Sequence, residues 1–125
     1  MKICSVESFH TLLFCSKWDD CIAFYRDILG FAVVDEKPGF IEFEVRPGSR
    51  IGLLQSVRDG ASKKRAAPHI LSFRIENLEE VHKDLSSRCP TASALRKHPW
   101  GALLFEIRDP EERRLEFWMP VRNTD

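Results

Sequence analysis

Two histidines and one glutamate in this sequence are of residue types that bind divalent metal ions. His10 lies near the start of the apolar run FHTLLFC, His69 near the start of HILSFRI, and Glu116 within RLEFW. Neutral imidazoles and a carboxylate can form a site with open coordination positions for a substrate. A single histidine in an apolar run is more often a core residue with a hydrogen-bond partner. A metal site therefore requires elements that bring the three residues together.

The order of predicted elements occurs twice along the chain. Each half begins with an apolar strand, continues with an amphipathic helix and ends with three strands, an internal repeat of about sixty residues. Ser16 is the expected N-cap of the first helix and Gly30 its end, and Asn77 and Cys89-Pro90 have these roles in the second. The predicted strands cover 9–15, 31–35, 40–45 and 50–56 in the first half, and 69–75, 92–96, 102–107 and 114–119 in the second.

The repeat makes His10 and His69 equivalent. FHTLLF in the first half corresponds to PHILSF in the second, and RIGLL corresponds to RLEFW, so that Gly52 is the counterpart of Glu116. Two histidines at one place in two modules are poorly explained as coincident core residues.

Alternation along the last strand places Glu116 and Trp118 on the face opposite Leu115 and Phe117. The apolar pair suits packing against the helix, so Glu116 is expected to point into whatever the sheet encloses. Burying a carboxylate without a partner costs too much free energy. A metal ion shared with the two imidazoles would be such a partner.

Length and composition describe one globular domain. The 125 residues form a single domain, 1–125, which we divide into module one (1–57), a connector (58–68) and module two (69–125). The 19 basic and 19 acidic residues balance, which argues against a nucleic-acid partner. No apolar stretch approaches the roughly 20 residues that cross a bilayer, and the N-terminus lacks a signal-peptide core. We therefore expect a cytoplasmic protein with no membrane partner, and four reduced cysteines without a CxxC pair.

The sequence resembles the vicinal oxygen chelate superfamily, which includes glyoxalase I, extradiol dioxygenases, fosfomycin-resistance enzymes and bleomycin-resistance proteins. The stretches that carry the resemblance are FHTLLFCSKWDDCIAFYRDILGF, PHILSFRIENLEEV and PWGALLFEIRDPEERRLEF. It implies an α+β fold of two tandem βαβββ modules that form a half-open mixed β-sheet barrel around a metal or ligand cavity. It also implies a homodimer. One departure is the turn Asp109-Pro110-Glu111-Glu112, which lacks the glycine often found there.

The superfamily takes its metal ligands from the first and last strands of each module. By position these places are His10, Gly52, His69 and Glu116, of which all but Gly52 can bind a metal. The resemblance thus implies one divalent ion (Fe, Mn, Zn or Ni) on His10, His69 and Glu116, acting as a Lewis acid on a small oxygen-chelating substrate. Glyoxalase I-like members have a carboxylate at the place of Gly52, which weakens an isomerase assignment.

Other residues complete the predicted site. His98, in the loop before Pro99, is a candidate acid or base, with Glu116 as the other catalytic group. Glu42, Glu44 and Glu106 are possible additional ligands, although positions on exposed strand faces explain them better. Tyr25 is expected to be packed and His82 to be at the surface. The substrate cavity is expected to be apolar and to be lined by Leu12, Phe14, Gly52, Leu54, Leu71, Phe73 and Trp118.

The sequence therefore predicts a small metal-dependent enzyme, in the lyase or dioxygenase range, that acts on a small-molecule substrate. Two alternatives stay open. One is a metal-free small-molecule-binding protein similar to the bleomycin-resistance proteins. The replacement of the fourth metal ligand by Gly52 would be a first step toward such a loss of the metal site. The other is a fosfomycin-type thiol transferase, for which Arg96 and Lys97 are the only basic residues near the expected site.

Overall fold

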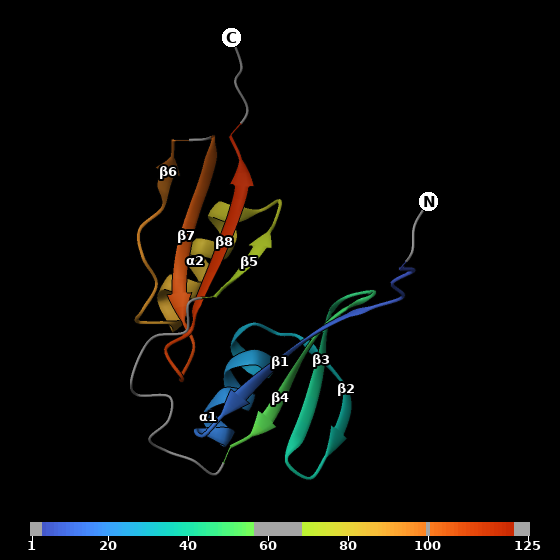
Figure 1. Cartoon of the computed structure of the whole chain (residues 1–125). Coiled ribbons are helices and arrows are strands. Elements are labelled where there is room, and N and C mark those ends of the chain that lie inside the picture. The colour runs from blue at the N-terminus through green and yellow to red at the C-terminus, as the bar shows by residue number, and fades with distance from the viewer. Residues whose placement is uncertain (1–3, 57–68, 100, 122–125) are drawn as a thin grey trace. The chain divides into compact units, whose positions relative to one another are not determined.

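The computed structural model describes residues 4–56, 69–99 and 101–121. The chain divides into two compact units, residues 1–64 and 65–125. Each unit has one four-stranded sheet, with the strand orders β1-β4-β3-β2 and β5-β8-β7-β6 (Figure 1). In both sheets the first strand runs parallel to the last, and the other neighbours are antiparallel. The predicted fold of two βαβββ modules is confirmed, and each sheet is open rather than closed on itself.

The strand boundaries lie close to those predicted, except for β6, which begins four residues later. The elements of the first unit are β1 (Phe9–Cys15), α1 (Trp18–Ala23), the π-helical turn η1 (Phe24–Ile28), β2 (Ala32–Lys37), β3 (Phe40–Arg46) and β4 (Ser49–Gln55). Those of the second unit are β5 (Ile70–Arg74), α2 (Leu78–Arg88), β6 (Arg96–His98), β7 (Ala102–Arg108) and β8 (Arg114–Pro120).

The first helix differs from the prediction at its start and in its second half. Lys17, not Ser16, is the N-cap, and it makes no capping hydrogen bond through its side chain. The backbone N–H of Leu29 then bonds to the carbonyl of Phe24, five residues back, at 3.0 Å. This wider turn directs both Phe24 and Tyr25 into the core, where they are 4% and 0% exposed. Gly30 ends the helix with a φ of +77°, as predicted.

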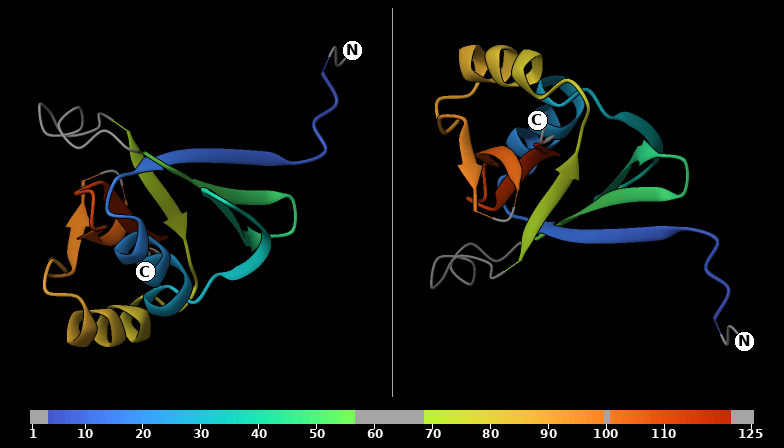
Figure 2. Two further views of the ribbon diagram at one scale, coloured as in Figure 1. Left: turned by 90° about the horizontal axis from the view of Figure 1, so that it is seen from below. Right: turned by 90° about the horizontal axis from the view of Figure 1, so that it is seen from above.

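One face of each sheet packs against the helix of its own unit, since α1 contacts β4 and α2 contacts β8. Figure 2 shows α2 running beside one face of the second sheet. The side chains of each strand alternate between this face and the opposite one, which no described helix of the same unit covers and which is called the open face below. The helix-packed face of the first sheet includes Ile41, Phe43, Ile51 and Leu53, and that of the second includes Phe105, Ile107, Leu115 and Phe117.

His82 is not a plain surface residue. Its Nε2 lies 2.9 Å from the carbonyl oxygen of Ser93, and its ring packs edge-on against Phe105 with centroids 4.7 Å apart. The helix stripe predicted for α2 left His82 outside the core, and this tertiary contact could not be read from periodicity.

The turn between β7 and β8 is built around Asp109, whose side chain is fully buried. Its Oδ1 accepts the backbone N–H groups of Glu111 and Arg113, each at 2.9 Å, and its Oδ2 accepts Nε–H of Arg113 at 2.9 Å. Glu112 follows with a φ of +67°, a conformation that favours glycine.

Cys4, Cys15, Cys21 and Cys89 form no disulfide in the described part of the chain. Of the described helices, none has the length and apolar character needed to cross a membrane.

Candidate functional site

The open face of the first sheet combines an apolar half with a polar half. Strands β1, β4 and β3 lie side by side there, and their paired residues form three rows. Leu12 and Phe14 on β1 are 53% and 66% exposed. The rows are Phe14–Leu54–Phe40, then Leu12–Gly52–Glu42, then His10–Arg50–Glu44.

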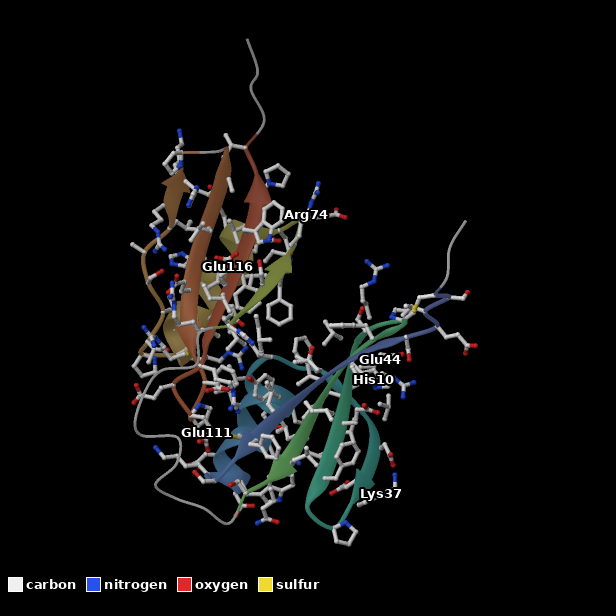
Figure 3. All side chains as sticks on the ribbon, viewed as in Figure 1. His10, Lys37, Glu44, Arg74, Glu111 and Glu116 are labelled. Atoms are coloured by element: carbon white, nitrogen blue, oxygen red, sulfur yellow. The ribbon has the colours of Figure 1, made fainter. Side chains whose placement is uncertain are left out.

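The polar half contains a hydrogen-bonded cluster of His10, Glu42 and Arg50. Nδ1 of His10 lies 2.7 Å from Oε2 of Glu42, and Nη1 of Arg50 donates to Oε1 of the same carboxylate at 3.4 Å. Glu42 is only 6% exposed, while the side chains of His10 and Arg50 are 40% and 35% exposed. Figure 3 labels His10 and Glu44, which stand at the two ends of the row that has Arg50 at its centre. The cluster is thus a buried carboxylate beneath two accessible basic side chains.

The two ring nitrogens of His10 are both engaged. Because a carboxylate only accepts, Nδ1 carries the proton donated to Glu42. In the neutral ring Nε2 is then an acceptor, and the hydroxyl of Ser8 lies 2.7 Å from it. Ser8 is exposed and only two residues away, so a ligand could displace this contact.

Gly52 provides space for two neighbouring side chains. A Cβ at this position would lie 2.8 Å from Cδ2 of Leu12 and 3.1 Å from Cε1 of Phe40. The place that is the counterpart of Glu116 is therefore covered by hydrocarbon in the first unit.

The open face of the second sheet carries its own acidic and basic side chains. Glu116 accepts a hydrogen bond from Oγ of Ser72 at 2.7 Å, and Glu106 lies directly opposite Glu116 in the ladder. Glu106 binds Nη2 of Arg114 at 2.8 Å and Nη2 of Arg96 at 3.3 Å. The hydrogen bond from Arg114 is the main cause that lowers the pKa of Glu106, and Arg96 lowers it further. Glu106 is therefore held ionised rather than being a spare ligand.

The ladders correct the predicted equivalence of the two histidines. β1 pairs Leu12 with Gly52, and β5 pairs Ser72 with Glu116. Since Gly52 and Glu116 are counterparts, Leu12 corresponds to Ser72 and His10 corresponds to Ile70. His69 lies one residue earlier, exposed and just before β5. A shift of one residue reverses the face in a strand, so the alternation of β5 assigns His69 to the side opposite Glu116.

The same register places the residues of the second sheet that were predicted to line the cavity on two different faces of that sheet. Leu71 pairs with Leu115 and Phe73 with Phe117, on the helix-packed face. The rings of Phe73 and Phe117 stack with centroids 5.2 Å apart. Trp118 is on the opposite face, beneath the guanidinium of Arg74 at 5.5 Å. The expectation that Leu71 and Phe73 share a face with Trp118 is wrong, whereas Leu12, Phe14, Gly52 and Leu54 do share one.

His98 and Glu116 lie on the same open face but far apart. His98 pairs with Ala102, which pairs with Pro120, four residues beyond Glu116 on β8. Four residues of strand span about 13 Å. The two predicted catalytic groups therefore do not touch in the second unit.

The predicted metal ligands do not form a cluster within either unit. His10 is in the first unit, His69 and Glu116 are in the second, and no group of three His, Cys, Asp or Glu side chains within the described ranges is spaced to hold a metal ion. Of the four ligand places implied by the resemblance, two carry Gly52 and Ile70. The residues present therefore do not fit a two-histidine, one-carboxylate site.

Sequence reasoning missed Arg50 as a site residue and favoured an exposed position for Glu42. Alternation correctly places Glu42 opposite Ile41 and Phe43, but it predicts an exposed side chain on a strand face without a helix. Glu42 is buried because His10 on β1 and Arg50 on β4 cover it. The available signal was an arginine and a glutamate at matching places in both halves.

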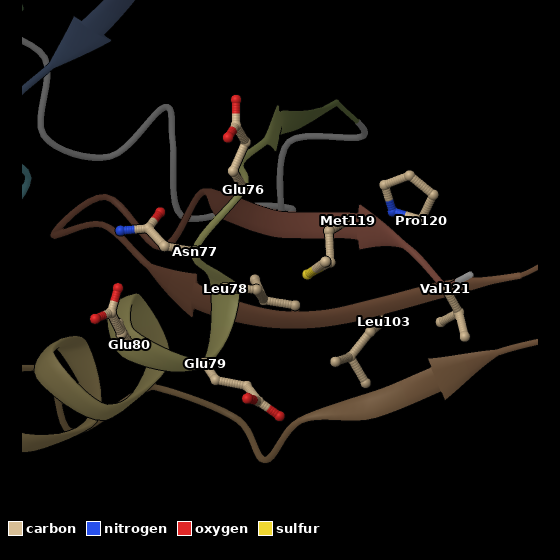
Figure 4. Close-up of a pocket in the computed structure, with 9 residues that line it drawn as sticks. All are labelled: Glu76, Asn77, Leu78, Glu79, Glu80, Leu103, Met119, Pro120 and Val121. Atoms are coloured by element: carbon tan, nitrogen blue, oxygen red, sulfur yellow. The ribbon is translucent and has the colours of Figure 1, made fainter. Parts of the chain in front are cut away.

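A separate pocket of about 450 Å³ lies in the second unit, between the start of α2 and the ends of β7 and β8 (Figure 4). Its apolar wall is formed by Leu78, Leu103, Met119, Pro120 and Val121, and its polar wall by Glu76, Asn77, Glu79 and Glu80. None of the predicted site residues lines this pocket.

Solved structures similar to this one belong to proteins of the same fold. A glyoxalase/bleomycin resistance protein/dioxygenase from Nocardioides is 16% identical, with a TM-score of 0.76 over 100% of this chain and 89% of that chain. A lactoylglutathione lyase from Agrobacterium tumefaciens is 22% identical, with a TM-score of 0.70 over 89% of this chain and 91% of that one. A virulence protein from Salmonella typhimurium is 23% identical, with a TM-score of 0.67 over 97% and 100%. At these identities the likeness establishes the fold alone.

No curated protein matches this sequence. The model of the Glyoxalase/Bleomycin resistance protein/Dioxygenase superfamily matches residues 8–117, which include both modules. The chain therefore belongs to the glyoxalase/bleomycin resistance protein/dioxygenase superfamily, the vicinal oxygen chelate group that its sequence resembles.

Proposed function

We propose that this protein binds a small organic molecule on the open face of the first sheet, without a chelated metal ion. The observation that carries the proposal is that two exposed apolar side chains, Leu12 and Phe14, lie on the same sheet face as the hydrogen-bonded cluster of His10, Glu42 and Arg50. Ligand sites in proteins typically combine apolar surface with a few fixed polar groups. The superfamily includes metal-free binding proteins as well as enzymes, so membership is compatible with this function.

The main alternative is a metal-dependent lyase or dioxygenase that uses His10, His69 and Glu116. One observation favours it, because a carboxylate bound to one ring nitrogen, as Glu42 is to His10, often orients a metal-binding histidine. Ile70 and Gly52 at two of the four ligand places weigh more heavily against it. We therefore assign no reaction step to a metal. If an ion were bound, it would supply Lewis-acid chemistry.

A fosfomycin-type thiol transferase has less support. It requires basic groups available for a phosphonate, and Arg96 is engaged with Glu106 at 3.3 Å.

We also propose that the chain forms a homodimer.

Metal content distinguishes the first two functions. Protein purified without an affinity tag should contain far less than one transition-metal ion per chain after dialysis against Fe(II), Mn(II), Zn(II) or Ni(II). His69→Ala should leave that content unchanged. About one tightly bound ion per chain, lost in His10→Ala, His69→Ala and Glu116→Gln alike, would establish the metal enzyme instead.

Ligand binding tests the proposed site directly. N-phenylnaphthylamine is a neutral aromatic probe that fluoresces in apolar surroundings, and the full chain should bind it. Leu12→Gln and Phe14→Gln should each weaken binding severalfold. Val34→Gln is the matched control, because Val34 is also an exposed apolar residue of the first sheet, at 40%, but lies on β2. Equal binding by all three variants would place the ligand elsewhere.

A further inference from the structure

We infer that the ligand of this open face carries an oxyanion group, such as a carboxylate or sulfonate, that binds the guanidinium of Arg50. The inference rests on the proposed function and adds the chemical class of the ligand. Nε of Arg50 is buried and has no hydrogen-bond partner in the described part of the chain.

A buried N–H without an acceptor is costly. The loss is about 1–3 kcal/mol for a neutral group and more for a charged one. The remaining contact of the guanidinium is also weak, since Nη1 lies 3.4 Å from Oε1 of Glu42. The Arg50 side chain is nevertheless 35% exposed, so an incoming group can reach it. An oxyanion with two oxygen atoms on one carbon or sulfur atom matches the paired donors of a guanidinium and would satisfy them.

The second unit shows what the same pair does without a histidine. Arg114 is the counterpart of Arg50, and Glu106 is the counterpart of Glu42. Glu106 accepts Nη2 of Arg114 at 2.8 Å and Nε at 3.4 Å, so one carboxylate serves both donors. In the first unit Oε2 of Glu42 is taken by His10 at 2.7 Å instead.

The difference between the units therefore follows from one residue. The counterpart of His10 is Ile70, which cannot compete for the carboxylate. His10 engages one oxygen of Glu42, and Nε of Arg50 is left without an acceptor among the described residues. This gives His10 a positioning role that requires no metal ion.

The same face provides a place for the rest of the ligand. Leu12 and Phe14 occupy the two rows beyond His10 on β1, and both are more than half exposed. A molecule with an oxyanion at one end and an aromatic or aliphatic body would contact Arg50 and these side chains together.

The test compares two probes that share a ring system. Anilinonaphthalene sulfonate carries an anionic group, and N-phenylnaphthylamine lacks it. The wild-type chain should bind the sulfonate about tenfold more tightly, the ratio expected for one charge-assisted interaction. Arg50→Met should abolish this preference, because it should weaken binding of the sulfonate about tenfold more than binding of the neutral probe. Arg114→Met is the matched control and should keep the preference.

A second variant tests the role of His10. His10→Ile gives the first unit the residue that the second unit has, so Glu42 is free to pair with both donors of Arg50. The ratio of the affinities for the sulfonate and the neutral probe should therefore fall severalfold. The Nε–H signal of Arg50 in the NMR spectrum of the wild-type protein gives a readout that does not depend on how the Arg50→Met variant folds. It should shift on addition of the sulfonate and not of the neutral probe.

The outcomes separate this inference from the function on which it rests. If the wild type binds both probes equally, or if Arg50→Met keeps the preference, the oxyanion assignment is wrong while apolar binding on this face stands. If Leu12→Gln and Phe14→Gln have no effect on either probe, the proposed function itself fails.

Discussion

His10 shows how a residue that is suitable for metal binding can have a different structural role. Its Nδ1–H is fixed on a carboxylate that is only 6% exposed, and that carboxylate otherwise neutralises an arginine. The hydrogen bond from His10 occupies one oxygen atom of the Glu42 carboxylate, so that only the other oxygen is available to Arg50. The residue types His, Glu and Arg could be read from the sequence, but their division of hydrogen bonds could not, because the three belong to different strands.

At the residue scale, Glu106→Gln should destabilise the protein in a pH-dependent manner. Arg114, with help from Arg96, lowers the pKa of Glu106 below its ordinary value of 4.5. A carboxyl group with a lowered folded-state pKa stabilises the fold above its unfolded pKa, and the effect is lost as the pH falls through the folded value. We expect a loss of about 1 kcal/mol in the free energy of unfolding at pH 7, measured with urea.

That loss should shrink as the pH falls below 4.5, the ordinary pKa of the group. Glu44→Gln serves as the control, since Glu44 is half-buried on the equivalent open face of the first sheet. Its replacement should change the free energy of unfolding by no more than about 0.5 kcal/mol. A Glu106→Gln effect of the same size at pH 3 and pH 7 would show that the ion pair is not its cause.

At the scale of elements, strands were predictable and their relative register was not. Alternation located β1 without error and the other strands, except β6, within two residues, since each strand has one buried face. Matching FHTLLF with PHILSF letter by letter makes His69 the counterpart of His10. The hydrogen-bonded ladders shift that alignment by one residue. Such a shift is invisible in composition but reverses the face of every side chain, and so the letter-by-letter match wrongly predicts His69 beside Glu116.

The turn between β7 and β8 gives a prediction at the scale of an element. Glu112 has a φ of +67°, which costs a residue with a Cβ about 1–2 kcal/mol. Glycine relieves this strain but loses more conformational entropy on folding. Glu112→Gly should therefore raise the free energy of unfolding by about 0.5–1 kcal/mol.

The neighbouring substitution Glu111→Gly is the control for that turn. Glu112 is the only non-glycine residue of the described chain with a positive φ, so Glu111 gains nothing from glycine. Its replacement should lower stability by about 0.5–1 kcal/mol. Thermal unfolding of the two variants should therefore shift in opposite directions, and a fall in both would contradict the strain argument.

At the scale of the whole molecule, the exposed residues of β1 indicate a surface that another chain covers. β1 is an edge strand of its sheet, next to β4 alone among the described strands. Phe9, Leu12 and Phe14 on it are 65%, 53% and 66% exposed. An edge strand with large exposed apolar side chains readily pairs or aggregates, so natural proteins usually cover it.

We therefore expect a homodimer that buries Phe9, at the end of β1 away from Leu12 and Phe14. Light scattering during size-exclusion chromatography should give twice the chain mass of 14.5 kDa. Phe9→Glu should give single chains, because a charge in an apolar interface costs more than the contact gains. Val34→Glu, on the opposite edge strand β2, should remain dimeric. If Phe9→Glu also remained dimeric, β1 would not be the interface, and its apolar side chains would be left to ligand binding alone.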